Sequence, residues 1–241
     1  MSQSILFYLI LPQIVKSVGS KNKLKRFREN ESFQNVVQPS REEITQGNFS
    51  LKGNWNKDFF KNEFPIVLEL GCGKGEYSVA LAQANPGKNF LGIDIKGARF
   101  WRGAKTALEE DLDNVGFMRT QIELIDLLFE ENEIDEIWIT FPDPQIKYKR
   151  TKHRLTNSQF LQKYKHVLKP GGMVNLKTDS EFMHGYTLGL LHGEGHEIIQ
   201  ANHDVYKNEY SPKDVTGIQT FYEKQYLEQG KPITYIQFKI K

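Results

Sequence analysis

From Pro65 onward, short apolar runs alternate along the chain with segments of helical length. The runs have the length and composition of buried strands, and they lie at 65–70, 89–95, 115–119, 136–141 and 173–177. Residues 78–84, 98–110 and 157–169 are helical by pattern, and the last of these is followed by Pro170-Gly-Gly, a typical helix stop. Strands and helices in alternation predict an α/β fold, with helices on both faces of a mostly parallel, doubly wound sheet.

The C-terminal part departs from this alternation. Residues 197–202 and 234–240 have the pattern of two further strands, and the segment 203–232 between them is polar. Two strands that follow one another without a regular crossover helix favour antiparallel pairing. The sheet is therefore expected to end in an antiparallel pair.

Composition limits the class of protein. The chain has 241 residues, of which 39% are hydrophobic, and this is enough for one large domain with a sizeable core. Cys72 is the single cysteine, which excludes an internal disulfide framework and a four-thiolate metal site. The sequence thus predicts a cytoplasmic protein without a bound metal.

The N-terminal region lacks the regular pattern of the rest. The apolar run 5–11 is far shorter than the ~20 residues of a membrane-spanning helix, so no membrane partner is expected. Residues 1–19 are predicted to be a disordered tail or a start-site extension, and residues 20–60 a basic N-terminal arm. The folded domain is expected to span residues 61–241.

A glycine-rich turn follows the first of these strands. It reads Glu69-Leu-Gly-Cys-Gly-Lys-Gly, with the spacing G-x-G-x-G rather than the G-x-G-x-x-G of dinucleotide-binding folds. Gly71 and Gly73 allow the backbone to lie close to a ligand, and Glu69 would repel a pyrophosphate but attract a cation. The next strand ends at Asp94, whose carboxylate can accept hydrogen bonds from two ribose hydroxyls.

This strand, glycine turn, helix, strand and acid resemble the class I S-adenosylmethionine-dependent methyltransferases. The resemblance implies a Rossmann-like sheet of seven strands, the last antiparallel, and makes residues 61–241 the methyltransferase domain. It implies that S-adenosyl-L-methionine lies across the carboxyl edge of the sheet. Where that family commonly has an Asp or Asn that binds the adenine, this chain has Gln121, which can still bond the adenine amino group. The expected cofactor-binding residues are Glu69, Gly71, Gly73, Asp94 and Gln121.

The fourth strand ends in Phe141-Pro-Asp-Pro, and a basic run follows at once. In the fold just named, this strand end faces the transferable methyl group, and the two prolines fix the direction of the Asp143 side chain. The formal net charge of the chain is only +2, so the basic run is a local concentration. Such a run beside a reaction centre favours a nucleic acid. The expected RNA-contacting residues are Lys149, Arg150, Lys152, His153 and Arg154.

Four motifs in order are similar to those of the tRNA (guanine-N(7)-)-methyltransferase family. They are FPDP, the basic run ending in Arg154-Leu-Thr, Lys177-Thr-Asp179, and Thr220-Phe-Tyr-Glu223. The resemblance implies methyl transfer to guanine 46 in the variable loop of tRNA, with Asp143 as the catalytic residue and a further cofactor contact. The implied substrate-binding residues are Lys147, Asp179, Thr220, Phe221, Tyr222 and Glu223. Gln145-Ile146 replaces the family's usual Trp-Pro, so the role of that tryptophan cannot be transferred.

Three other functions stay open from the sequence. An amino-methyltransferase acting on another base of RNA or DNA has a related motif at the same strand end. A small-molecule methyltransferase would not need the basic run, and a non-catalytic RNA-binding module would not need the glycine turn. The sequence does not distinguish a monomer from a homodimer.

Overall fold

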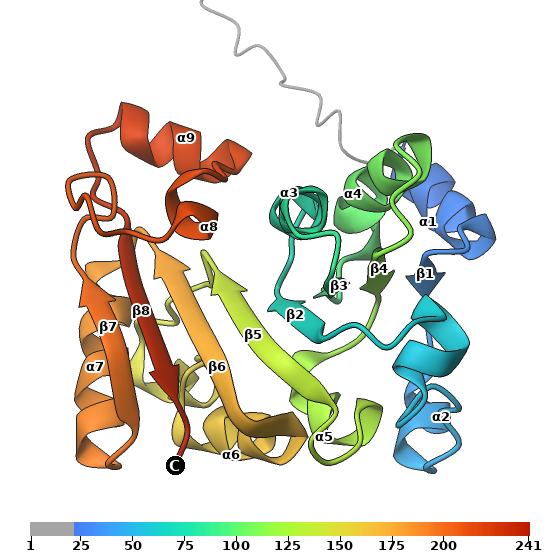
Figure 1. Ribbon diagram of the computed structural model, residues 1–241, viewed down its shortest axis with the longest axis horizontal. Helices are drawn as coiled ribbons and strands as arrows, with labels where there is room; N and C mark the ends of the chain where they lie inside the picture. Colours follow the sequence, from blue (N-terminus) through green and yellow to red (C-terminus); the bar gives the residue numbers. More distant parts are fainter. Residues whose placement is uncertain (1–21) are drawn as a thin grey trace, which may run out of the picture.

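The computed structural model describes residues 22–241, so the predicted tail at 1–19 lies outside the described residues. The described chain forms one sheet of eight strands in the order β1-β4-β3-β2-β5-β6-β8-β7 (Figure 1). The strands are β1 (Val36–Val37), β2 (Ile66–Leu70), β3 (Asn89–Ile93), β4 (Val115–Met118), β5 (Ile134–Thr140), β6 (Leu168–Thr178), β7 (Glu197–Asn202) and β8 (Thr234–Lys239).

The predicted fold class is confirmed. The pairs β1/β4, β4/β3, β3/β2, β2/β5 and β5/β6 are parallel, whereas β8 pairs antiparallel with both β6 and β7. Parallel strands need crossovers, and helices supply them. The α-helices are α1 (Lys23–Ser32), α2 (Arg41–Thr45), α3 (Glu76–Ala84), α4 (Gly97–Glu109), α5 (Ile125–Leu128), α6 (Ser158–Val167), α7 (Glu181–Gly193), α8 (Lys213–Thr216) and α9 (Phe221–Glu228).

Side-chain caps fix where the helices around the site begin. The side chains of Asn157, Ser180 and Thr220 accept hydrogen bonds from the backbone N–H groups at the third residues of α6, α7 and α9. Each cap satisfies an N–H group that the helix itself cannot pair. Because Ser180 and Thr220 lie at the carboxyl edge of the sheet, these caps also fix the walls of the site described below.

The segment 22–60, predicted to be an arm, folds against the rest of the sheet. Strand β1 pairs with β4, and α1 packs on α4. Trp55, in the π-helix η1 (Trp55–Phe60), is 0% exposed and donates from Nε1 to the carbonyl of Leu128. The segment therefore adds a strand and a buried aromatic anchor to the sheet, which its polar sequence does not reveal.

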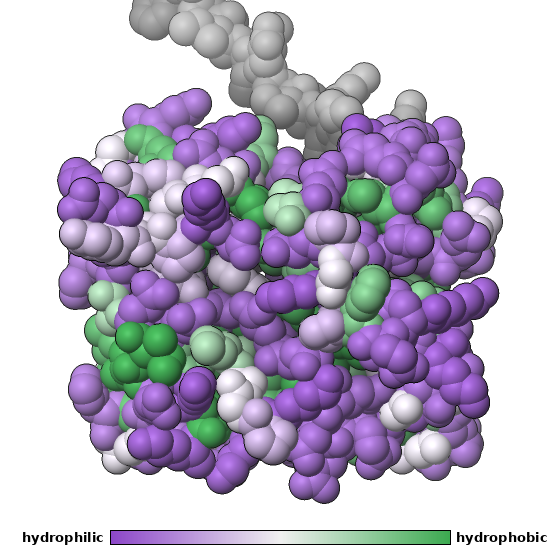
Figure 2. All heavy atoms as spheres, in the orientation of Figure 1, coloured by the Kyte–Doolittle hydropathy of each residue, from purple (hydrophilic) through white to green (hydrophobic). Residues whose placement is uncertain are grey.

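Two apolar clusters lie on the two faces of the sheet, as a doubly wound fold requires. Figure 2 shows a mainly hydrophilic face with an apolar patch towards the β7 side. Among residues 22–241, no helix combines the length and the apolar character that crossing a membrane requires. Figure 1 shows α8 and α9 above the end of the sheet to which β5 and β6 point.

Candidate active site

The glycine turn lies between β2 and α3, with all three of its glycines at positive φ. The φ angles are 80° at Gly71, 57° at Gly73 and 76° at Gly75, and residues that carry a side chain rarely adopt such values. A Cβ atom added to Gly71 would meet no atom within 4 Å, since it would point into open space. A Cβ at Gly75 would instead lie 2.5 Å from the ring of Phe117. The first glycine therefore faces a ligand space, and the third allows close packing.

Glu69 lies under this turn and is only 4% exposed. Its carboxylate accepts hydrogen bonds from the backbone N–H and hydroxyl of Ser78 and from the hydroxyl of Thr140. Burial raises the pKa of Glu69 from 4.5 to about 7, while the bonds from Ser78 and Thr140 act in the opposite direction. A cation placed above Glu69 would favour its charged form.

Asp94 closes the other side of the turn. Its carboxylate accepts from the N–H of Gly73 at 3.1 Å and from the N–H of Lys96 at 2.7 Å. Two cavities meet at this residue, and we name them the turn cavity and the Gln121 cavity. The turn cavity, about 110 Å³, is lined by Glu69, Gly71, Cys72, Gly73, Lys74, Glu76, Asp94, Arg99, Thr140, Phe141, Thr220 and Tyr222.

The Gln121 cavity has a volume of about 280 Å³ and is lined in part by Gln121, one of the predicted cofactor-binding residues. Gln121 is exposed and accepts a hydrogen bond from the guanidinium of Arg41, which comes from the N-terminal segment. Arg150 and His153 of the basic run line the same cavity. The structure thus brings the predicted cofactor residues to one edge, together with two residues predicted to contact RNA.

Asp143 lies in an exposed loop that lines a third space, the acid cavity, of about 530 Å³. The residues flanking Pro142-Asp143-Pro144 both have positive φ: Phe141 at 48° and Gln145 at 48°. Non-glycine residues adopt this conformation rarely and at a free-energy cost of roughly 1–3 kcal/mol, and such strain is often found at functional sites. The Asp143 carboxylate accepts from the N–H of Gln145 at 3.1 Å. The acid is therefore held in a tight turn.

Arg154 departs from its predicted place on the RNA-facing surface. It is only 6% exposed, and its guanidinium donates to the carbonyls of Gln145 and Ile146. It also lies over the rings of Phe182, at 4.8 Å, and Tyr186, at 4.4 Å. A planar guanidinium suits such a stacked, multiply bonded position. Arg154 thus clamps the end of the Asp143 loop.

The rest of the basic run forms the 3-10 helix η3 (Tyr148–His153). Lys147, Lys149 and Lys152 are exposed, and Tyr148 is 93% exposed. Arg150 donates from Nε to the side-chain oxygen of Gln145 at 2.9 Å. Gln145 therefore fastens the run to the Asp143 loop, in the position where the related family usually has a tryptophan.

Of the substrate-binding residues predicted after β6, some line the cavities and others do not. Asp179 and Tyr222 line the acid cavity, and Thr220 and Tyr222 line the turn cavity. Phe221 lies over the ammonium of Lys74 at 3.7 Å, and its N–H donates to Glu76. Glu223 departs from its predicted place, because it is 0% exposed and pairs with Lys177 at 2.7 Å. Its carboxylate faces Lys177 and Tyr206, not the cavities.

Comparison with known proteins identifies the family. A family model described as "Putative methyltransferase" matches residues 63–236. The chain is 78% identical to a tRNA (guanine-N(7)-)-methyltransferase of Christiangramia forsetii, over 93% of this chain and 100% of the relative. It is 51% identical to the protein of the same name from Porphyromonas gingivalis, over 80% of this chain and 78% of the relative. The chain belongs to the tRNA (guanine-N(7)-)-methyltransferase family.

Solved structures agree with this tRNA (guanine-N(7)-)-methyltransferase family assignment at the level of the fold. An antibiotic-related methyltransferase matches with a TM-score of 0.57 and 18% identity, over 86% of this chain and 96% of that chain. The 16S rRNA methyltransferase KamB matches with a TM-score of 0.56 and 15% identity, over 84% and 94%. At such low identity, the likeness concerns the fold alone.

Some residues at the site of this tRNA (guanine-N(7)-)-methyltransferase family member were not predicted. Lys96 and Arg99, at the start of α4, line the acid cavity beside Asp143 and Asp179. Thr140 and Ser78 hold Glu69. The position of Lys96, three residues after the end of β3, could have indicated its place in the site, since residues just beyond a parallel strand lie at the ligand edge. Hydroxyl partners of a buried acid carry no sequence signal.

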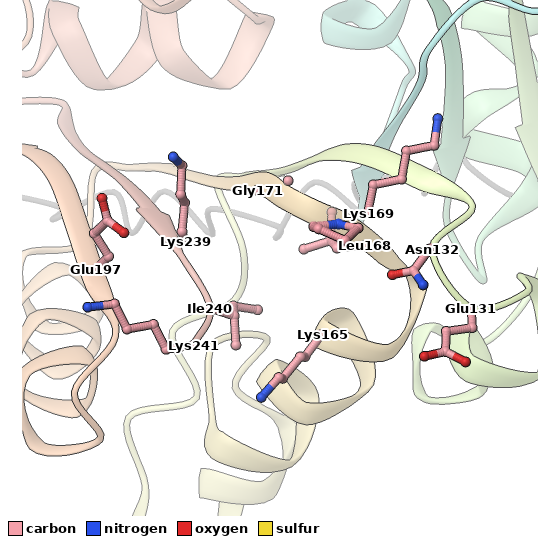
Figure 3. Close-up of a pocket in the computed structure, with 12 residues that line it drawn as sticks. Glu131, Asn132, Lys165, Leu168, Lys169, Gly171, Glu197, Lys239, Ile240 and Lys241 are labelled. Atoms are coloured by element: carbon pink, nitrogen blue, oxygen red, sulfur yellow. The ribbon is translucent and has the colours of Figure 1, made fainter.

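A further concavity of about 510 Å³ lies at the opposite edge of the sheet, where β6 begins. Its lining includes Lys165, Lys169, Lys239 and Lys241, but the labelled side chains splay apart, as Figure 3 shows. Lys169 is already paired with Asp135. Within residues 22–241, no group of three or more metal-binding side chains occurs.

Proposed function

We propose that this protein transfers a methyl group from S-adenosyl-L-methionine to nitrogen 7 of a guanine in tRNA. By family resemblance the guanine is number 46 of the variable loop. One observation carries the proposal: Arg99, Phe141 and Tyr222 line both the turn cavity and the acid cavity. A ligand held at the glycine turn therefore adjoins the space that Asp143 lines.

The residues at the turn fit S-adenosyl-L-methionine. Its ammonium and sulfonium groups match the buried carboxylate of Glu69, and its ribose hydroxyls match Asp94. Gln121, which lines the Gln121 cavity, can accept a hydrogen bond from the adenine amino group. When bound, this cofactor supplies an electrophilic methyl group on a positively charged sulfur. The relatives' names, all of methyltransferases, agree with such a donor.

Asp143 has the catalytic role in this proposal. Nitrogen 7 of guanine carries an in-plane lone pair and no proton, so the protein needs no general base. The chain must instead position the ring and stabilise the positive charge that develops on it. Asp143 suits this task, since two prolines and the Arg154 clamp hold its loop. Its carboxylate needs little reorganisation when the charge develops.

Residues from the tail and the basic run hold the RNA. Asp179 and Thr220 can accept hydrogen bonds from the Watson–Crick edge of the guanine, which lies opposite nitrogen 7. The exposed rings of Phe221 and Tyr222 can stack on bases. Lys147, Lys149 and Lys152, with His153, contact the backbone, because a displaced nucleotide needs its neighbouring phosphates held.

The test is methyl transfer from labelled cofactor to unmodified tRNA, followed by mapping of the modified base. We expect 7-methylguanine at a single position. An N-methylated adenine or cytosine would instead establish the amino-methyltransferase alternative. Transfer to small molecules without tRNA binding, or tRNA binding without cofactor binding, would overturn the proposal in favour of the two remaining alternatives.

A further inference from the structure

Lys177, on β6, carries a fully buried ammonium group with a complete set of partners. The side chains of Lys177 and Glu223 are both 0% exposed, and Nζ lies 2.7 Å from one carboxylate oxygen and 2.9 Å from the other. The ammonium also donates to the carbonyls of Val215 at 2.5 Å and Ile218 at 3.0 Å. Tyr206 donates from its hydroxyl to Glu223 at 2.7 Å. Both charges are therefore satisfied inside the protein.

A buried ion pair of this kind is a weak source of stability. Desolvation of the two charges offsets most of their attraction, and apolar residues of similar size often serve the fold as well or better. Such a pair can, however, specify one arrangement of the segments that it joins. The question is which segments Lys177 and Glu223 join.

Lys177 contacts three segments that help to line the turn cavity and the acid cavity. Its side chain holds the loop 215–218 and the first turn of α9, where Thr220 and Tyr222 line the cavities. Its carbonyl accepts at 2.8 Å from the N–H of Phe141, the residue that leads into the Asp143 loop. Two residues further along the chain, Asp179 lines the acid cavity.

Glu223 completes this connection from the tail. It lies one turn after the Thr220 cap, whose hydroxyl accepts from the Glu223 N–H at 3.3 Å. Its side chain is directed into the protein, while Phe221 and Tyr222 are exposed and Tyr222 lines both cavities. The orientation of this first turn therefore depends on the Glu223 carboxylate finding its partners.

We propose that Lys177 and Glu223 form a positioning pair, which sets the first turn of α9 against the Asp143 loop, and that Glu223 does not itself bind the guanine. This inference rests on the proposed function for its kinetic test. It differs from the expectation that Glu223 reads the substrate, and the two can be separated by experiment.

The test compares Lys177→Met, Glu223→Gln and the double variant carrying both changes. Each single change leaves one buried group without its partner, so we expect kcat/KM for tRNA to fall by about 10²-fold, the usual effect of a misplaced site. The double variant removes both charges, and we expect it to recover to within about 10-fold of the wild type. Assays are run well below the melting temperature of each variant, so that all are folded.

Two results would overturn the proposal. If Glu223 bound the guanine, the double variant would be no more active than Glu223→Gln alone. If the pair were only structural, both single variants would show wild-type kcat and KM once folded. The exposed pair Lys105 and Glu109, 3.7 Å apart, is the matched control, and changing it to Met and Gln should leave the kinetics unchanged.

Two further measurements complement these kinetics, and the second of them needs no tRNA turnover. Tyr206→Phe removes only the outer hydrogen bond to Glu223, and we expect KM for tRNA to rise by about 5-fold; unchanged kinetics would contradict the proposal. Hydrogen exchange over residues 215–228 should speed up in Lys177→Met and slow again in the double variant. If the wild type fails to methylate tRNA, the proposed function falls, and this exchange pattern still decides the positioning role.

Discussion

Glu69 and Asp143 are acids with opposite surroundings at one site. Glu69 is buried and accepts three hydrogen bonds, whereas Asp143 is exposed and accepts one, from the N–H of Gln145. A buried acid of raised pKa responds to a bound cation, and an exposed acid on a fixed turn presents its charge directly. The two residues are therefore suited to cofactor binding and to the reacting base, respectively.

Replacing Asp143 with Asn should slow turnover and leave the fold intact. The amide oxygen can still accept from the N–H of Gln145, so the turn is kept, but the charge is lost. Loss of one preorganised electrostatic group typically lowers the rate by about 10²-fold or more. Single-turnover methyl transfer at saturating cofactor measures this, with thermal melting as the control. A near-normal rate would reduce Asp143 to a turn residue.

Glu69 should make stability depend on pH. Its pKa in the folded protein is about 7, above its ordinary value of 4.5, so the folded state holds this proton more tightly than the unfolded chain does. The free energy of unfolding therefore falls as the pH rises from 4.5 through 7, by at most about 3 kcal/mol, and then levels off. Denaturant titrations of the wild type and Glu69→Gln at several pH values measure this contribution of Glu69 to the free energy of unfolding. Identical pH profiles would contradict it.

At the scale of elements, the loop after β5 shows where a sequence pattern can mislead. The motif and its basic run predict the place of Asp143 and the exposure of Lys149 and Lys152. They do not predict that Arg154 turns inward, because its partners, Phe182 and Tyr186 on α7, lie far along the chain. The sequence of a basic run does not show which of its residues is buried against partners elsewhere in the fold.

Replacing Arg154 with Lys should therefore affect the loop and not the RNA electrostatics. Lysine keeps the charge but loses the bonds that the guanidinium makes to the carbonyls of Gln145 and Ile146. We expect a loss of about 1–3 kcal/mol in stability and a slower turnover. The salt dependence of tRNA binding should stay as in the wild type. An unchanged stability with weaker tRNA binding would restore Arg154 to the RNA surface.

Neutralising Lys149 and Lys152 should change the salt dependence of tRNA binding, which Arg154→Lys leaves unchanged. Each phosphate contact contributes about 0.7 to 0.9 units to the slope of log affinity against log salt, so the double Ala variant should lose roughly 1.4 to 1.8 units. Turnover at saturating tRNA and cofactor affinity should change little. Lys165→Ala with Lys239→Ala, at the opposite edge, is the matched control. Equal slopes for all three proteins would mean that the run is only a solvated loop.

For the whole molecule, sequence predicts the seven strands β2 to β8 and their α/β arrangement, because β2 to β6 contain compact apolar runs and β7 and β8 carry apolar residues between polar ones. It does not predict β1, since Val36–Val37 is a strand only through its pairing with β4. The inward turn of Glu223 is missed for a similar reason, because Lys177 lies 46 residues away. Local patterns thus predict the strands and the edge of the sheet that carries the proposed site, whereas β1 and the burial of Glu223 depend on residues far apart in the sequence.

The role of the N-terminal segment can be tested at Trp55. Its ring packs on Phe129 at 5.4 Å, and its Nε1 bonds the carbonyl of Leu128, so η1 is anchored to the region that precedes β5. Trp55→Ala should lower the free energy of unfolding by about 3–5 kcal/mol, in one cooperative transition.

Denaturation followed by circular dichroism measures this loss of stability. The control is Trp101→Ala, on the half-buried face of α4, which should cost clearly less. If residues 20–60 were an independent arm, the loss of Trp55 would leave the unfolding of residues 61–241 unchanged. We expect the stability of the whole domain to fall, because the buried Trp55 ring packs between the N-terminal segment and the region before β5 and its loss removes contacts from both.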